Sequence, residues 1–271
     1  MSPLARSGLG ILVAMSLLAL AAPVIAPMDP DRQVLSEKFR GPGPGHLLGQ
    51  DHAGRDILSR IVYGARVSML VGFSTVGISV LLGLALGSIA GYFGKYADEV
   101  IMRVIDVLQA FPGILLAIAL TAVLGPSLRN IILALSVLGW VGYARIVRGE
   151  FLRLREMEFV SAARALGAGD FRIILRHILP NIWAPLIVQA TFGVAAAILG
   201  EASLSFLGLG VQGIPSWGGM LNEGIDFLSR APHISIFPGL ALMLSILGLN
   251  FLGDGLRDRL DPRMRAFGIG G

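Results

Sequence analysis

The chain contains no cysteine among its 271 residues. A disulfide framework, a thiolate nucleophile and a cysteine metal site are therefore excluded. Charged residues are scarce too, at 15% of the chain, whereas about a quarter of the residues in a soluble domain carry a charge. Hydrophobic residues make up 54% of the chain, and the mean hydropathy is +0.74. This composition indicates an integral membrane protein.

The signatures of several enzyme classes are also missing. The sequence has no G-x-x-x-x-G-K-[ST] pattern, so it binds no nucleotide through a P-loop, and it has neither H-E-x-x-H nor G-x-S-x-G. An intramembrane protease or ligase would need paired catalytic residues at matched depth, and the apolar segments hold mostly single polar residues. We therefore expect a non-catalytic protein without a cofactor of its own.

Six apolar segments are each long enough to cross about 30 Å of hydrocarbon as a helix. They are Ser7–Ala26, Val67–Tyr92, Met102–Leu124, Asn130–Val147, Ile182–Leu209 and Ile234–Leu252. Arg6 before the first segment could mark a secretory signal, but the length of this segment and the five that follow favour an uncleaved first span. The predicted fold class is an all-α polytopic membrane protein with six transmembrane helices.

The excess of basic residues does not indicate a nucleic-acid partner. The formal net charge is only +4, and the Lys and Arg residues cluster beside the apolar segments. With the N-terminus inside, 14 of the 22 basic residues lie on the cytoplasmic side, and six of the other eight lie in one long outer segment before the second span, where they weigh less. We therefore expect both termini to be cytoplasmic.

The first outer loop, Pro27–Ala65, contains a Pro/Gly connector and then an apolar helical face formed by Ile57, Leu58, Ile61 and Val62. This face predicts an amphipathic helix lying at the outer membrane surface. Four side chains of the loop could be metal ligands: His46, Asp51, His52 and Asp56. Helix capping and loop polarity are the favoured explanation, because no second set of ligands appears elsewhere in the sequence, and we predict no metal site. The chain divides into residues 1–66, the first span with its loop, and residues 67–271, a five-helix core.

A polar, arginine-rich segment at about residues 151–181 interrupts the apolar pattern. It predicts two short amphipathic helices, with apolar stripes formed by Phe159, Ala162, Ala163 and Leu166 and by Phe171, Ile174, Leu175 and Ile178. Gly167 suits the left-handed C-terminal cap of the first helix, and Asp170 suits the N-cap of the second. A polar helical hairpin with an apolar stripe, attached to membrane spans, predicts a docking site for another protein.

The hairpin resembles the EAA loop of ABC-importer permeases. Ala162-Ala163, Gly167 and Leu179-Pro180 match its spacing, whereas Ser161 stands where a Glu is usual and His177 where an Ile is usual. From Gly45 onward the chain is similar to the dipeptide/oligopeptide/nickel branch of these permeases, in motifs such as Gly54-Arg-Asp-x-Leu-Ser-Arg60, Gly91-Tyr92, Ala110-Phe-Pro112 and Glu201-Ala-Ser-Leu-Ser-Phe-Leu-Gly-Leu-Gly210.

The resemblance implies a type I ABC-importer permease of the "C" type in a bacterial inner membrane. Its implied partners are a second permease chain, two ATPase subunits that use ATP and Mg, an extracytoplasmic solute-binding protein and membrane lipid. The implied ATPase-docking residues are Glu158, Phe159, Ser161, Ala162, Ala163, Arg164, Leu166, Gly167, Asp170, Leu179 and Pro180.

Peptides, or peptide-like solutes such as glutathione, are the expected cargo on this resemblance. Nickel chelates are the alternative within the family. An ATP-independent channel subunit is the alternative from another class, disfavoured because a channel needs no docking hairpin.

Three features of the apolar segments complete the expectations. Glu201 lies late in the fifth span, where a carboxylate is costly unless it is paired or hydrated. It either lines the translocation path with Ser203 and Ser205 or makes a structural hydrogen bond to a neighbouring helix, and the sequence leaves both open. A face of Gly83, Gly87 and Gly91 predicts close helix packing. Trp217 could anchor at the membrane interface or meet the binding protein.

Overall fold

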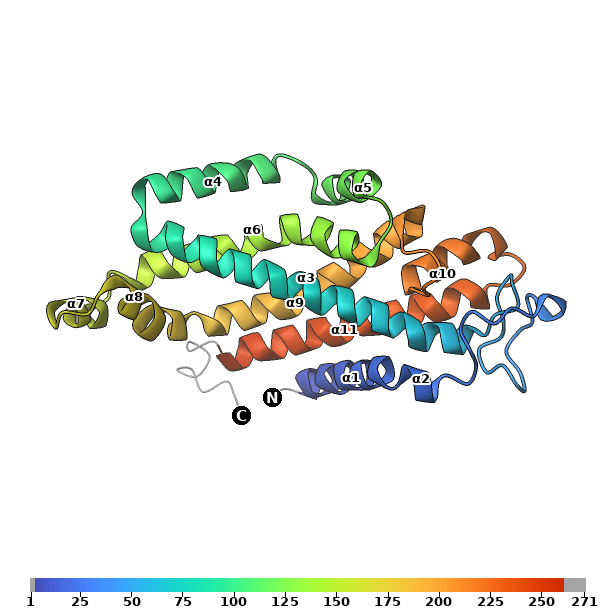
Figure 1. Cartoon of the computed structure of the whole chain (residues 1–271). Coiled ribbons are helices and arrows are strands. Elements are labelled where there is room, and N and C mark those ends of the chain that lie inside the picture. The colour runs from blue at the N-terminus through green and yellow to red at the C-terminus, as the bar shows by residue number, and fades with distance from the viewer. Residues whose placement is uncertain (1–2, 261–271) are drawn as a thin grey trace.

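The computed structural model describes residues 3–260, nearly all of which lie in helices, with no strand among them (Figure 1). Five helices are long and apolar enough to cross a membrane: α1 (Pro3–Leu20), α3 (Ile57–Phe93), α6 (Leu128–Leu154), α9 (Trp183–Leu204) and α11 (His233–Leu260). A short π-helical turn, Ser205–Leu209, extends α9. The all-α membrane fold is therefore confirmed.

The predicted third span is broken. Residues Lys95–Gln109 form α4 and residues Gly113–Leu124 form α5, and the two helices bend by 84° at the break. The prediction of one continuous helix over Met102–Leu124 is therefore wrong. Pro112 explains the break, because a proline lacks the N–H that a helix interior requires and pushes the residue before it out of the helical conformation. The described chain thus has five straight candidate spans, or six if the bent pair counts as one.

The predicted helix on the outer membrane surface is also wrong. Residues from Ile57 onward are the first turns of α3, a continuous helix of 37 residues, and Ile57 is fully buried. Asp56 caps this helix by accepting a hydrogen bond from the Ser59 N–H at 2.8 Å. At 1.5 Å per residue, α3 is about 55 Å long, well beyond the hydrocarbon thickness of about 30 Å. The division placed after residue 66 falls inside this helix.

The glycine face of α3 packs against α6, as predicted. A Cβ at Gly87 would lie 2.6 Å from the Ala144 carbonyl oxygen, and a Cβ at Gly91 would lie 2.5 Å from Phe151 Cβ. Side chains do not make contacts this short, so only glycine allows the two backbones to approach so closely. The contact fixes α3 and α6 as the central pair of the bundle.

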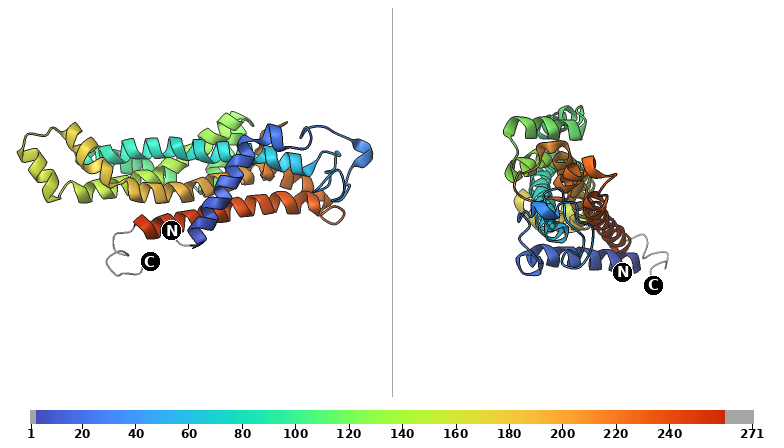
Figure 2. Two further views of the ribbon diagram at one scale, coloured as in Figure 1. Left: turned by 90° about the horizontal axis from the view of Figure 1, so that it is seen from below. Right: turned by 90° about the vertical axis from the view of Figure 1, so that its right-hand side faces the viewer.

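The other long helices surround this pair. In Figure 1, α9 and α11 run alongside it, and Figure 2 shows α1 crossing the bundle obliquely over α11. A Cβ at Gly8 of α1 would lie 2.5 Å from the Gly248 carbonyl oxygen, so this crossing also depends on glycine. The predicted hairpin projects from one end of the bundle, here called the hairpin end. The loop before α3 and the short helix α10 (Trp217–Gly224) lie at the opposite end, the loop end.

Candidate functional site

The hairpin consists of α7 (Glu158–Ala165), α8 (Asp170–Ile173), a π-helical turn (Ile174–Ile178) and a 3-10 turn (Leu179–Asn181). It leaves the bundle where α6 ends and returns where α9 begins, so that it stands outside the apolar helices (Figure 1). All eleven predicted docking residues lie in this hairpin, although the second predicted helix is α-helical for only one turn.

Gly167 takes the left-handed conformation that was predicted for it, with φ of +84°. Its N–H donates to the Arg164 carbonyl at 3.0 Å, and the Ala168 N–H donates to the Ala163 carbonyl at 3.0 Å. This pair of bonds is a Schellman motif, which ends α7 and turns the chain back toward the bundle. A Cβ at Gly167 would meet no atom within 4 Å. The backbone conformation, rather than space, therefore requires glycine here.

The predicted N-cap role of Asp170 is wrong. Gly169 occupies the cap position, and Asp170 is the first residue of α8. The Asp170 carboxylate instead accepts a hydrogen bond from the Tyr92 hydroxyl at 2.5 Å. Tyr92 lies at the end of α3, and Arg164 Nη2 lies 3.5 Å from the same hydroxyl. Tyr92 thus connects both halves of the hairpin to a membrane helix. Because Tyr92 and Asp170 are 78 residues apart in the chain, the sequence carried no indication of this contact.

The hairpin has one packed side and one exposed side. Val160 and Ala163 of α7 are buried, as are Ile173 and Ile178 after the turn. Four large apolar side chains remain exposed, and two of them almost completely: Leu166 (89%), Phe171 (76%), Leu175 (45%) and Phe159 (40%). The predicted stripes are therefore split between the two sides. Exposed apolar side chains beyond the end of a helical bundle are typical of a protein contact surface.

Further bonds join the hairpin end into one body. The Arg155 guanidinium donates to the Gly91 carbonyl of α3 at 3.1 Å. Arg148 of α6 makes a two-pronged ion pair with Asp98 of α4, and its Nη2 lies 2.6 Å from Asp98 Oδ2. These contacts connect α3, α4 and α6 where the hairpin begins.

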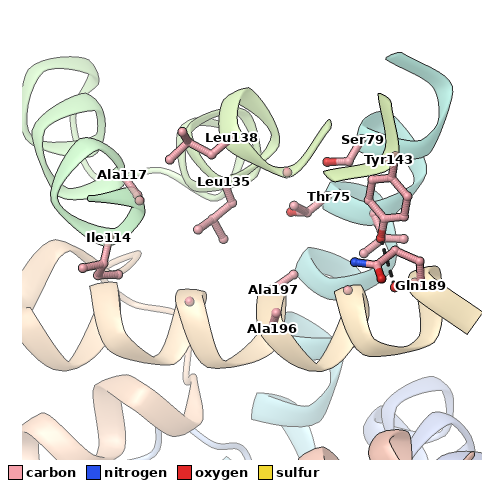
Figure 3. A pocket seen from close by; sticks show the side chains of 15 residues that line it. Thr75, Ser79, Ile114, Ala117, Leu135, Leu138, Tyr143, Gln189, Ala196 and Ala197 are labelled. Atoms are coloured by element: carbon pink, nitrogen blue, oxygen red, sulfur yellow. Dashed lines mark hydrogen bonds between the residues drawn. The ribbon is translucent and has the colours of Figure 1, made fainter. Parts of the chain in front are cut away.

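A cavity of about 380 Å³, here called the membrane cavity, lies between α3, α5, α6 and α9 (Figure 3). Small and apolar side chains line most of it. Its polar groups are uncharged: Thr75, Ser79, Tyr143 and Gln189. Sequence analysis missed this cavity, although Gln189 is a conspicuous amide in an otherwise apolar segment. A mid-bundle cavity with a few polar groups is the usual form of a small-molecule site.

Glu201 lies in the last turn of α9 and is 1% exposed. Its carboxylate accepts a hydrogen bond from Ser205 Oγ at 2.6 Å, one turn further along the chain. The Ser203 hydroxyl donates to the Leu199 carbonyl of its own helix at 2.8 Å. None of these three residues lines the membrane cavity, and a role for them in the translocation path stays a prediction.

A network of ion pairs joins the loop before α3, the start of α3 and α10 at the loop end. Asp51 Oδ2 lies 2.6 Å from both Arg55 Nε and Arg60 Nη1, and both guanidinium groups also reach Glu223 of α10 at 2.6 Å. Burial raises the pKa of Asp51, but the Arg55 N–H and the two guanidinium groups outweigh it and hold the pKa below the ordinary value. The pKa of Glu223 is likewise lowered, because its bonds to Arg60 outweigh burial.

The residues considered as metal ligands fall into separate groups. His46 Nδ1 lies 2.9 Å from Asp56 Oδ1, whereas the His52 ring stacks on Phe227 with centroids 5.7 Å apart. Asp51, His52 and Glu223 bring ligand-type atoms within 4.8 Å of one another. The carboxylates of Asp51 and Glu223 already hold two guanidinium groups, however, and these occupy the place that a cation would take.

Trp217 plays neither of the roles considered for it from sequence. It is fully buried, and its Nε1–H donates to the Ile61 carbonyl of α3 at 3.0 Å. A Cβ at Gly64 would lie 2.9 Å from Trp217 Cδ1, so glycine makes room for the indole. Trp217 therefore fastens α10 to α3 inside the protein.

Comparison with known proteins shows the class to which this helical membrane bundle, with its cavity and projecting hairpin, belongs. Residues 83–266 match the family described as binding-protein-dependent transport system inner membrane component. Residues 1–42 match the N-terminal transmembrane domain of oligopeptide transport permease C. The chain therefore belongs to the family of binding-protein-dependent transport inner membrane components.

Individual relatives are similar over almost the whole chain. The dipeptide transport system permease protein DppC of Alkalihalophilus pseudofirmus is 47% identical over 264 residues, which cover 97% of this chain and 87% of the relative. The glutathione transport system permease protein GsiD of Pectobacterium atrosepticum is 42% identical, with 96% and 87% covered. The solved inward-facing MetNI methionine ABC transporter shares the fold, with a TM-score of 0.58 at 19% identity over 74% of this chain and 96% of that one.

These findings confirm the predicted class. The chain is a non-catalytic, multi-pass inner-membrane permease subunit of an ABC importer, of the type I fold. Membership of this family implies that the chain works with further subunits of an importer.

Proposed function

We propose that this permease imports di- or oligopeptides, or a peptide-like solute such as glutathione, as one of two permease chains that together form the translocation path. Relatives named for dipeptide and glutathione transport support this cargo. The chemistry of the membrane cavity supports it too, since hydroxyl and amide groups can bond to peptide groups without selecting a side chain. No His, Asp or Glu lines this cavity within residues 3–260, so nothing there favours a nickel chelate.

The hairpin Glu158–Pro180 seats in ATPase subunits that bind ATP and Mg. The observation that carries this proposal is the exposure of large apolar side chains, above all Leu166 and Phe171, on a hairpin that lies beyond the membrane helices. Arg164, Arg172 and Arg176 are also exposed there, and they add positive charge around the apolar centre. An apolar centre with a charged rim is the usual composition of an interface.

Transport follows by alternating access. ATP binding draws two ATPase subunits together and moves the hairpin, and the bonds from Tyr92, Arg155 and Arg148 pass this movement to α3, α4 and α6. Because α3 and α6 line the membrane cavity, their rocking opens it alternately to the two faces. A solute-binding protein delivers the cargo at the loop end, which faces outward, while both termini and the hairpin face the cytoplasm.

The absence of cysteine makes the orientation directly testable. A single cysteine at Ser36, which is exposed, is expected to react with an impermeant thiol reagent in intact cells, whereas a cysteine at the exposed Ser161 reacts only after lysis. Labelling of the Ser161→Cys variant from outside would overturn both the orientation and the docking proposal.

The cargo is tested by uptake into vesicles that contain the complete importer and its binding protein. We expect uptake of labelled dialanine to require ATP and to be competed by unlabelled peptides. Uptake that continues without ATP would revive the channel alternative, and competition by a nickel chelate but not by peptides would overturn the proposed cargo.

A further inference from the structure

Two cavities border α9, and Gln189 lines both of them. The membrane cavity follows α9 from Gln189 to Gly200. The second cavity has a volume of about 530 Å³ and runs from Asn181, in the turn before α9, along α9 to Phe192, with α6 and α11 completing its wall. Gln189 therefore stands where the two cavities meet.

This position is the hairpin-side limit of the membrane cavity along α9. The helix rises about 16 Å between Gln189 and Gly200, which is about half of the hydrocarbon thickness. Within residues 3–260, Gln189 is the one residue that lines both cavities, so a solute that moves along α9 from the membrane cavity to the second cavity passes its side chain.

A buried neighbour bonds to the backbone of Gln189. Tyr143 is 3% exposed, and its hydroxyl donates to the backbone carbonyl oxygen of Gln189 at 3.4 Å. A Cβ at Gly193 would overlap this hydroxyl, so the ring fills the space that glycine leaves on α9. Figure 3 shows the Tyr143 ring and the Gln189 side chain together at one end of the cavity. The ring thus has a fixed place on the cavity wall.

The Gln189 amide, by contrast, is free. Its side chain makes no hydrogen bond to any other part of residues 3–260, and it is only partly buried. A primary amide has two donors and one carbonyl acceptor. It can therefore bond to the N–H and the C=O of a peptide group as readily as to water.

The two cavities differ in charge on either side of this amide. The membrane cavity presents the uncharged hydroxyls of Thr75 and Ser79, whereas the second cavity presents Glu150, Arg153 and Arg257. An uncharged group with both donors and acceptors is suited to the boundary, since it can bond to a solute on either side without holding it by charge.

We propose that Gln189, held beside the fixed ring of Tyr143, closes the passage between the two cavities and exchanges hydrogen bonds with the amide groups of the passing solute. The inference rests on the proposed function, because it takes the solute to be peptide-like. The closure itself can be tested without any solute.

The first experiment measures closure. A single cysteine at Ala196, in the wall of the membrane cavity, is placed in the complete importer with cysteine-free partner subunits. The probe is an impermeant methanethiosulfonate reagent added from the hairpin side without ATP. Shortening the side chain by Gln189→Ala is expected to speed modification about tenfold, which corresponds to a barrier lowered by about 1.4 kcal/mol.

Thr191→Val is the matched control for this experiment. Thr191 lies two residues further along α9, bonds to the Ile187 carbonyl of its own helix at 2.9 Å and lines neither cavity. Its substitution should leave the rate unchanged. Equal rates of modification with Gln189 and with Gln189→Ala would overturn the gate.

The second experiment measures the exchange of hydrogen bonds. Gln189→Leu keeps the size of the side chain and removes the amide, and it is expected to lower the maximal uptake of labelled dialanine about two- to tenfold, the worth of one hydrogen bond. ATP hydrolysis and complex assembly should be retained. If no version of the importer takes up dialanine, the proposed cargo fails while the thiol result still decides the gate. Normal uptake by Gln189→Leu would overturn the exchange of hydrogen bonds.

Discussion

The two ends of the bundle are stabilised by opposite means. At the loop end, charged side chains are buried and paired with one another, with Asp51 fully buried and Arg60 only 4% exposed. At the hairpin end, apolar groups are exposed, and the bond from Tyr92 to Asp170 lies at the surface. The ion pairs of the loop end therefore form within the chain, whereas the hairpin end offers an apolar surface that a partner would cover.

This difference suits the two ends to different tasks. Separating the members of a buried network of charges is costly, because each charge left without its partner remains desolvated. The hairpin packs only one apolar side against the bundle, and the hydrogen bonds at its surface are worth about 1 kcal/mol each, so it can shift at a lower cost than the buried charges. We expect the loop end to act as a rigid frame and the hairpin end as the part that moves.

The largest expected effect is at the loop end. Asp51→Ala would leave Arg55 and Arg60 with one carboxylate between them, and removing one partner of a buried ion pair costs about 3–5 kcal/mol. Subunit abundance and the melting temperature of the purified complex should both fall sharply. Asp226→Asn, at an exposed position nearby, is the control and should change neither. A stable Asp51→Ala complex would show that the network is not a structural frame.

The next largest effect is expected at the turn of the hairpin. Gly167→Val places a β-branched residue at φ of +84°, which costs about 1 kcal/mol or more and misdirects the chain after α7. The spans should still insert, but co-purification of the ATPase subunits, or the coupling of ATP hydrolysis to uptake, should fail.

Gly169→Ala is the control for this substitution. Gly169 has an ordinary φ of −71°, and a Cβ there would meet no atom within 4 Å. It should behave nearly as the unchanged chain does. Full ATPase binding and full transport by Gly167→Val would disprove the coupling role of the hairpin.

A smaller effect is expected where the hairpin meets α3. Tyr92→Phe removes the bond to Asp170, worth about 1 kcal/mol, without changing the packing of the ring. ATPase binding should persist while the amount of solute moved per ATP falls, because the hairpin then moves with less effect on α3. Tyr96→Phe, at a side chain that is 84% exposed, is the matched control. A normal amount of solute moved per ATP in the Tyr92→Phe variant would show that other contacts provide the coupling.

The smallest effect is expected from pH. The pKa values of Asp51 and Glu223 lie below their ordinary values of 3.8 and 4.5, so their stabilisation is fully present above those values and is lost only as pH falls through the lower, folded-state pKa values. Melting temperature should therefore not change through these groups between neutral and mildly acidic pH. A fall in melting temperature well above pH 4.5 that disappears in the Glu223→Gln variant would contradict this prediction.

Much of the molecule could be predicted where the cause is local. Long apolar runs predicted the membrane helices, glycine spacing predicted the close contact of α3 with α6, and the position of Gly167 between two amphipathic stretches predicted its left-handed turn. Local patterns also misled. The apolar face after Asp56 predicts a surface helix. Periodicity alone, however, cannot distinguish a helix that lies on a membrane from the first turns of a longer, buried helix.

The candidate site was predictable only in part for the same reason. The hairpin is a single segment with its own pattern, so its residues could be named in advance. The membrane cavity draws on four helices, and the bond from Tyr92 to Asp170 joins positions 78 residues apart. A sequence read along its length gives no distance between such residues.

The sequence by itself determined that this chain lies in a membrane, that it is helical and that it carries a polar hairpin, because hydrophobicity, helix periodicity and backbone freedom act between near neighbours. Tertiary structure decided which polar groups meet. It placed Glu223 on Arg55 and Arg60, Tyr92 on Asp170, and Gln189 beside Tyr143, because the helices bring together in space residues that the chain holds far apart.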